Sequence, residues 1–347
     1  MSEYLSIGVN NVVYLLRIII NPKLMVAHQT PDFDFDFNLR EELSVLDNHK
    51  GHREIPDIED DKLLIATWNL TNFGLQNRED QHLTIMARIC SYFDIVAIQE
   101  IADDLGHLND ILEKLGDDYS MLVTDIAGNR ERLGYIYNNT KIQPTGMVAE
   151  LAMRGYEKKR IFIQIGDEEE SVSFEGFNRN PYMVTFKAGE FEFTLVNVHL
   201  YWSNYLFRRL ETMALSKWAK KRVNKNFAPN NDIILIGDFN MERLSPNDDI
   251  YGPLVNNGLY VPKFDTNLVG TNLAGDSHYD EIAFFPSRTE EDFTDRIGVF
   301  DFDKVIFNSL WDEDDKDQKK KFYQYIRYFI ADHRPLWCQF HINRNIV

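Results

Sequence analysis

The stretch MVTFKAGEFEFTLVNVHL, residues 183–200, contains two apolar runs of strand length that are separated by a short turn. Gly189 lies in this turn, and glycine readily adopts the backbone conformations that tight hairpins require. The second run ends on His199, directly after apolar residues. We therefore expect an antiparallel hairpin that presents a polar side chain at the end of a buried strand.

Similar runs occur before and after this hairpin. They are LLIATWNL (63–70), DIVAIQE (94–100), RLGYIYN (132–138), DIILIGDFN (232–240), EIAFF (281–285) and LWCQFHI (336–342). Helical patterns lie between them, at residues 80–93, 108–119 and 203–225. Strands that alternate with helices, together with antiparallel hairpins, predict an α/β protein with mixed β-sheets.

The composition is that of a globular chain with a large core. The 347 residues are 44% hydrophobic and 27% charged, which suits one large domain or two ordinary ones. Cys90 and Cys338 lie in apolar contexts and are predicted to be buried thiols, so we expect a cytoplasmic protein. The formal charge of −18 argues against a protein that holds nucleic acid by bulk electrostatics. An acidic protein can still bind phosphate when a cation lies in its cleft, so metal dependence is expected.

Residues 1–61 form an extension before the expected catalytic domain, residues 62–347. Residues 5–20 are largely apolar, but Asn10, Asn11 and Arg17 interrupt the run, so no membrane-spanning helix is predicted. We expect a helix here to dock on its own domain; self-association, a partner interface and a membrane surface are the alternatives. Residues 28–61 contain eleven acidic residues against three basic ones and are predicted to be a linker or surface extension.

Polar side chains recur where the apolar runs begin or end. They are Asn69, Glu100, His199, Asp238, Asn240, Asp280, Asp332 and His333. Strand ends can present side chains to a shared cleft while the middle of the sheet remains buried, so this set predicts one site. Carboxylates suit Mg²⁺, and histidines exchange protons near neutral pH, which together indicate metal-assisted hydrolysis of a phosphate ester.

Eight motifs carry a family resemblance. In order, they are TWNLTNFG, AIQE, NRERLGYIY, FNRNPYMVTF, VNVHL, GDFN, YDEIAF and ADHRP, and they span about residues 63–342. Their order resembles that of the endonuclease/exonuclease/phosphatase superfamily, and most of all its deoxyribonuclease I-like branch. The resemblance implies a four-layer α/β/β/α sandwich of two mixed β-sheets flanked by helices, with a cleft at one end.

The resemblance also implies a metal and phosphate site. Glu100 is the expected main Mg²⁺ ligand, with Asn69 and Asp332 near the metal or the phosphate; Mn²⁺ is an alternative ion. Asp238 and Asn240 are expected to position the phosphate and the attacking water. A structural Ca²⁺ is less expected, because Asn180 stands where this branch has an acidic residue.

The same resemblance implies roles for two histidines and an arginine. His333 is the expected general base, oriented by Asp280. His199 is the expected acid or phosphate donor, paired with Glu131. Arg179 is expected to bind the scissile phosphate through both nitrogens of its fork.

The expected function is that of a Mg²⁺-dependent phosphodiesterase, most of all a DNA endonuclease with nucleic acid as its partner. Two positions depart from the deoxyribonuclease pattern, because Ala102 and Asn129 stand where an arginine and an aromatic residue would contact the minor groove. A phosphoesterase for phosphoinositides, sphingomyelin or small nucleotides is an alternative, and a non-catalytic binding or assembly protein is a second one.

Overall fold

The structure is a computed structural model, and it describes residues 25–164, 171–224, 232–242, 244–264, 270–311 and 315–343. The helix expected over residues 5–20 lies outside this described part. Among the described residues, none of the helices combines the length and the apolar character needed to cross a membrane.

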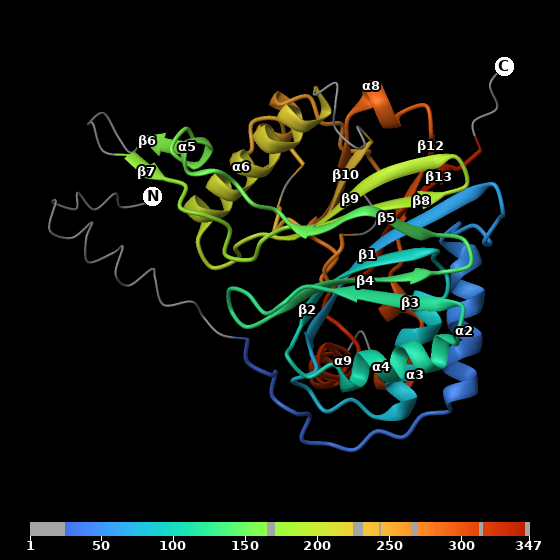
Figure 1. Cartoon of the computed structure of the whole chain (residues 1–347). Helices are drawn as coiled ribbons and strands as arrows, with labels where there is room; N and C mark the ends of the chain where they lie inside the picture. The colour runs from blue at the N-terminus through green and yellow to red at the C-terminus, as the bar shows by residue number, and fades with distance from the viewer. Residues whose placement is uncertain are drawn as a thin grey trace, which may run out of the picture.

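Two large β-sheets form the centre of the molecule (Figure 1). The first has the order β12 (Phe293–Val299), β13 (Leu336–His341), β1 (Lys62–Phe73), β2 (Ile95–Ile101), β4 (Arg132–Asn138) and β3 (Tyr119–Val123). The second has the order β11 (Asp280–Phe284), β10 (Ile233–Asp238), β9 (Phe191–His199), β8 (Tyr182–Ala188) and β5 (Gln143–Glu150). A separate two-stranded sheet contains β6 (Phe162–Gln164) and β7 (Ser171–Ser173).

Both large sheets are mixed, as the sequence predicts. β1 runs parallel to β2 in the first sheet, and β9 runs parallel to β10 in the second, whereas their other pairings are antiparallel. The expected hairpin is β8–β9, with Gly189 at φ 56° in its turn. The apolar runs noted in the sequence form β1, β2, β4, β8, β9, β10, β11 and β13.

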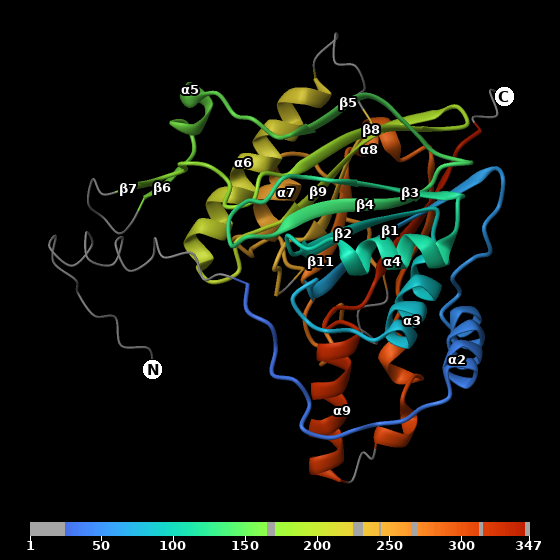
Figure 2. The same cartoon turned by 60° about the horizontal axis from the view of Figure 1, so that its bottom comes forward.

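Helices cover the outer faces of the two sheets, so the layers run helix, sheet, sheet, helix (Figures 1 and 2). On the first sheet lie α2 (Leu39–His52), α3 (Asp80–Cys90), α4 (Gly106–Leu115) and α9 (Lys316–Phe329). On the second lie α6 (Tyr205–Val223) and α7 (Tyr251–Asn256). The shorter helices are α5 (Gly155–Lys158), α8 (Pro286–Thr289), η1 (Phe302–Lys304) and η2 (Asn308–Leu310). The expected four-layer α/β/β/α sandwich is confirmed.

The core between the two sheets is apolar for most of its length. Leu133, Tyr135 and Tyr137 of β4 point into it, whereas Ile136 points to the helix layer. Buried polar contacts also cross between the sheets; in one of them, Gln99 Nε2 donates to Asn197 Oδ1 at 2.6 Å. Because both amides are satisfied in a dry interior, this contact holds β2 against β9 close to the strand ends that carry the site.

The N-terminal extension differs from the expected linker. α2 buries Leu46, and Phe33, Phe35 and Phe37 contact the helix layer of the first sheet. Phe35 and Phe37 pack edge-on against Phe307, with ring centroids 5.8 and 4.8 Å apart. The acidic composition concealed this packing, because aspartates alternate with the phenylalanines and remain exposed, and only the phenylalanines are partly buried. Residues 33–52 are therefore part of the folded domain.

Both cysteines are buried free thiols, as the sequence predicts. Burial raises the pKa of the Cys90 thiol to about 12, and it raises the pKa of Cys338 well above the ordinary range. Neither thiol is therefore ionised at neutral pH, and neither lies in the cleft described next.

Candidate active site

A cleft of about 670 Å³ opens at the strand ends where the polar residues gather. Its lining includes Glu100, His199, Asp238, Asn240, Asp332 and His333. Asn69, Glu131, Asp280 and Arg179 lie behind this lining and contact its members. The structure thus brings together the predicted site residues from both sheets, although their chemical roles remain predictions.

The register of the second sheet aligns three of these residues in one row. Asp238 on β10 pairs with His199 on the parallel strand β9 and with Asp280 on the antiparallel strand β11. Gly237 permits this alignment, because a Cβ on it would lie 2.1 Å from the Val198 carbonyl oxygen. Any larger residue would push β10 away from β9 and would separate the carboxylate from the histidine.

A local irregularity in the first sheet turns Glu100 into the cleft. The register between β1 and β2 shifts after Asn69, and Thr71, Asn72 and Glu100 all have positive φ angles, between 48° and 59°. Such angles are strained for these residue types, and a β-branched threonine is a clear outlier. The carboxylate of Glu100 compensates by accepting hydrogen bonds from Asn69 Nδ2 at 3.0 Å and from the Asn72 amide at 2.8 Å.

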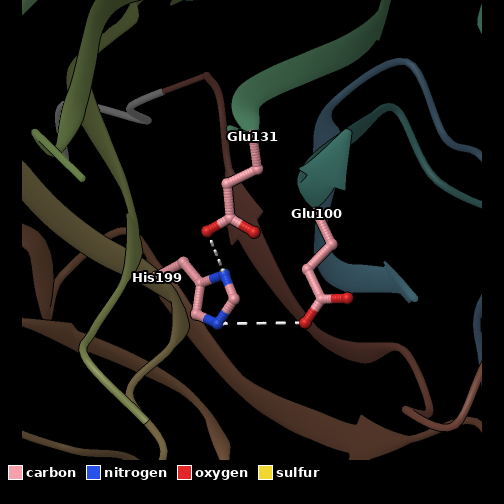
Figure 3. Close-up of side chains that lie close together, drawn as sticks. All are labelled: Glu100, Glu131 and His199. Carbon is pink, nitrogen blue, oxygen red and sulfur yellow. Dashed lines mark ion pairs between the residues drawn. The ribbon is translucent and has the colours of Figure 1, made fainter. Parts of the chain in front are cut away.

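His199 lies between two carboxylates, as Figure 3 shows. Its Nδ1 is 2.9 Å from Glu131 Oε1, and its Nε2 is 4.0 Å from Glu100 Oε1 and 3.5 Å from Asp238 Oδ2. Burial and the charge of Arg179 both lower the pKa of His199, but Glu131 and Asp238 outweigh them, so the net shift is upward. Burial raises the pKa of Glu131, but Arg179 and His199 pull it below its ordinary value. Both shifts favour the charged pair of an imidazolium beside a carboxylate.

Arg179 occupies a different place from the expected one. The residue is 3% exposed, and its Nε lies 2.7 Å from Glu131 Oε1 and donates to the His199 carbonyl. Its two terminal nitrogens donate to Asn129 Oδ1 and to the Leu200 carbonyl, each at 2.8 Å. The guanidinium therefore holds the end of β9 and pairs with the charge of Glu131. Its terminal nitrogens point to these protein acceptors and not to a phosphate. A sequence motif alone could not distinguish these two placements.

His333 has its own buried carboxylate. Its Nδ1 is 2.7 Å from Asp280 Oδ2, and its Nε2 is 3.8 Å from Asp238 Oδ2. Burial lowers the pKa of His333, yet Asp280, Asp238 and Asp332 together raise it well above the ordinary value. Burial raises the pKa of Asp280 to about 6 despite the attraction of His333. Because Asp280 holds Nδ1, the Nε2 atom is the one that faces the cleft.

Asp332 and Asn240 also line the cleft. Thr71 Oγ1 donates to Asp332 Oδ1 at 2.6 Å, and the Asp332 amide donates back to Thr71 Oγ1 at 2.8 Å. Asn240, at φ 50°, donates its amide N–H to Asp238 Oδ1 and its side-chain Nδ2 to the Leu200 carbonyl. These contacts immobilise the two side chains before any substrate binds, although Thr71 was not singled out by its motif.

The described residues include one cluster that could hold a metal ion: Glu100, Glu131 and His199. The contacts within this cluster favour Glu100 alone as the ligand, because Glu131 already contacts the cationic Arg179 and His199. Glu100 fits a cation better, since it faces the cleft and its pKa is raised by burial and by the neighbouring Glu131 and Asp332, against the attraction of His199. A bound cation would relieve this repulsion.

Comparisons with known proteins identify the fold. No family model and no curated relative matches the chain. Among solved structures, the chain shares the four-layer fold of endonuclease/exonuclease/phosphatase proteins, which confirms at the level of fold what the motifs imply.

Three of these structures have the same architecture over most of the chain. A family protein from Bacteroides thetaiotaomicron has a TM-score of 0.51 and 20% identity, over 81% of this chain and 95% of that one. A mannosyl-6-phosphatase from the same organism has a TM-score of 0.50 and 18% identity, over 80% and 99%. The catalytic domain of human Nocturnin, solved with a bound sulfate anion, has a TM-score of 0.51 and 14% identity, over 82% and 96%.

Proposed function

We propose that the protein is a metal-dependent phosphoester hydrolase. The observation that carries this proposal is the pair of imidazoles facing one carboxylate oxygen. His199 Nε2 and His333 Nε2 lie 3.5 and 3.8 Å from Asp238 Oδ2, and each ring has a buried carboxylate at its Nδ1. Two histidines that are oriented separately can serve as acid and base on opposite sides of a phosphorus atom.

The division of roles follows from the surroundings of each ring. Glu131 favours the protonated form of His199, so this residue is suited to donate a proton or a hydrogen bond to a phosphate oxygen. His333 is held through Nδ1 by Asp280, so its Nε2 can take a proton from the attacking water once the ring is neutral. Asp238, which receives a hydrogen bond from Asn69 Nδ2 at 3.1 Å, can orient that water.

A divalent cation completes this proposal. Glu100 would hold it, with Asn69 and Asp332 close by, and Mg²⁺ is the ion that such oxygen ligands suit best. When bound, the ion would offset negative charge on the phosphate oxygens. The carboxylates of the cleft would then no longer repel an anionic substrate.

For the substrate, we propose a nucleic acid phosphodiester, with DNA as the first choice and endonucleolytic cleavage as the reaction. The motif NRERLGYIY supports this choice through Glu131, which pairs with His199 as the deoxyribonuclease-like resemblance implies. A small phosphoester is the second candidate, because Ala102 is only 2% exposed and offers no groove contact.

A substrate panel with Mg²⁺, Mn²⁺ and Ca²⁺ tests the proposal. Plasmid, linear and single-stranded DNA would be incubated beside inositol phosphates, sphingomyelin and sugar phosphates. His333→Ala should lower the rate by roughly 10²- to 10⁴-fold while circular dichroism and melting remain close to wild type. Turnover of a lipid or sugar ester with intact DNA would replace the first choice by the second. No metal-dependent hydrolysis of any ester would leave a binding or assembly role.

A further inference from the structure

The N-terminal segment, defined here as residues 25–28, forms one wall of the cleft. Met25, Val26 and His28 all line it. The Met25 amide donates to the Asn129 carbonyl at 3.0 Å, and the His28 amide donates to Gln76 Oε1 at 3.0 Å. Two loops of the first sheet therefore anchor the segment, one on each side of Val26.

This segment lies where contact with a double helix was expected. The carbonyl of Asn129, the position expected to carry a groove-reading aromatic, accepts the hydrogen bond from Met25. His28 Nε2 is 3.8 Å from Asp332 Oδ2, so the segment also reaches the loop that carries Asp332 and His333. From the cleft, the chain continues along α9 towards α2, as both views show (Figures 1 and 2). A duplex would have to displace this wall to bring its backbone to Glu100.

An aromatic ring and a cation also line the cleft. Trp202 is 44% exposed and lines the cleft. Arg208 is 6% exposed, donates from Nη1 to the Trp202 carbonyl at 3.1 Å, and lies 3.7 Å from Glu242 through Nη2. Its buried Nε has no hydrogen-bond partner among the described residues. An exposed aromatic ring can stack on an unpaired base, and Arg208 holds the backbone of this residue through the Trp202 carbonyl.

The volume of the cleft is consistent with a ligand of nucleotide size. This volume of about 670 Å³ lies within the range of roughly 300–1,000 Å³ that is typical of sites for compact ligands. A site of this size suits one or two nucleotides.

We propose that the cleft takes single-stranded nucleic acid, with a base stacked on Trp202, and that the N-terminal segment excludes the duplex. This inference rests on the proposed phosphodiesterase function and names its substrate class. A base that is already unpaired can turn its flat face to the Trp202 ring. Its phosphate can then reach Glu100, His199 and His333 in the cleft. A paired base would have to unstack first.

The experiment compares four substrates in Mg²⁺: bis(4-nitrophenyl) phosphate, a labelled single-stranded DNA 20-mer, its duplex, and the RNA of the same sequence. Wild type should cleave the single strand at least tenfold faster than the duplex. Trp202→Ala should raise KM for the single strand by roughly 5- to 150-fold, with a smaller change in kcat. Tyr156→Ala, which removes an exposed ring on α5 outside the cleft lining, should change neither constant.

A second variant tests the wall itself. Replacing Met25, Val26 and His28 by glycine together should raise duplex cleavage relative to single-strand cleavage. Equal wild-type rates on duplex and single strand, with hydrolysis of bis(4-nitrophenyl) phosphate intact, would overturn this inference alone. An unchanged KM in Trp202→Ala would overturn the stacking contact. No hydrolysis of any of the four substrates would instead overturn the proposed phosphodiesterase function.

Discussion

Glu131→Gln separates the charge of this residue from its shape. Glu131 is 1% exposed, and its Oε1 lies 2.7 Å from Arg179 Nε and 2.9 Å from His199 Nδ1. Two unit charges at 2.9 Å attract by about 6 kcal/mol at an effective dielectric constant of about 20, before the cost of burial is subtracted. Glutamine keeps the volume and removes this attraction. Burial and Arg179 would then lower the pKa of His199.

The assay is the pH dependence of kcat/KM. An acid must be protonated to act, so the rate falls as the pH rises through its pKa, and Glu131→Gln should move this alkaline limb to lower pH. At pH 8 we expect a loss of roughly 10²-fold or more, with a smaller loss at pH 6. An alkaline limb at the wild-type position would refute the pairing of Glu131 with His199 as acid.

A stability measurement accompanies this assay, because Glu131 also neutralises Arg179. Breaking a buried ion pair costs about 3–5 kcal/mol, but Arg179 keeps three neutral acceptors, so the protein should still fold. Glu281→Gln is the matched control. Burial raises the pKa of Glu281 well above the ordinary range, which favours its neutral form, and as the neighbour of Asp280 on β11 it points to the opposite face of the sheet.

Three further predictions concern other parts of the site. Asp280→Asn should lower the pKa of His333 and move the acid limb of the rate profile to lower pH, because a base acts in its neutral form; a limb that stays in place argues against His333 as base. Glu100→Gln should raise the Mg²⁺ concentration for half-maximal activity at least tenfold, as titration with a chelator-buffered metal would reveal. Asp303→Asn should lower the free energy of unfolding by about 3–5 kcal/mol, measured with urea, because it leaves the buried Arg334 guanidinium unpaired.

Most of the strands that the sequence predicted lie inside the two sheets; the edge strand β11 was predicted as well, because all of its residues are buried. β2, β9 and β10 are buried along almost their whole length and therefore appear as continuous apolar runs. β3, β5 and β12 escaped prediction because they lie at sheet edges and alternate or expose many of their residues. Periodicity identifies a strand only when neighbours cover it on both sides or on one whole face.

The candidate site was foreseeable for residues that stand beside a strand end. His199 and Asp238 each end a buried strand, and their alignment follows from the parallel pairing of β9 with β10. Thr71 and Arg208 gave no comparable signal. Their positions depend on a register shift in β1 and on a side chain that reaches from α6, and neither can be read from local sequence.

The sequence by itself determined the α/β class with mixed sheets and the polar residues at the strand ends, because burial imposes apolar runs; the four layers were implied by the family resemblance. Only the tertiary structure decided what each charge faces. It placed Arg179 behind Glu131 rather than in the cleft, and it folded the acidic extension onto the helix layer. It also carried residues 25–28 to the mouth of the cleft. Such contacts join residues far apart in the chain, and their energies depend on distance and burial, which no local pattern encodes.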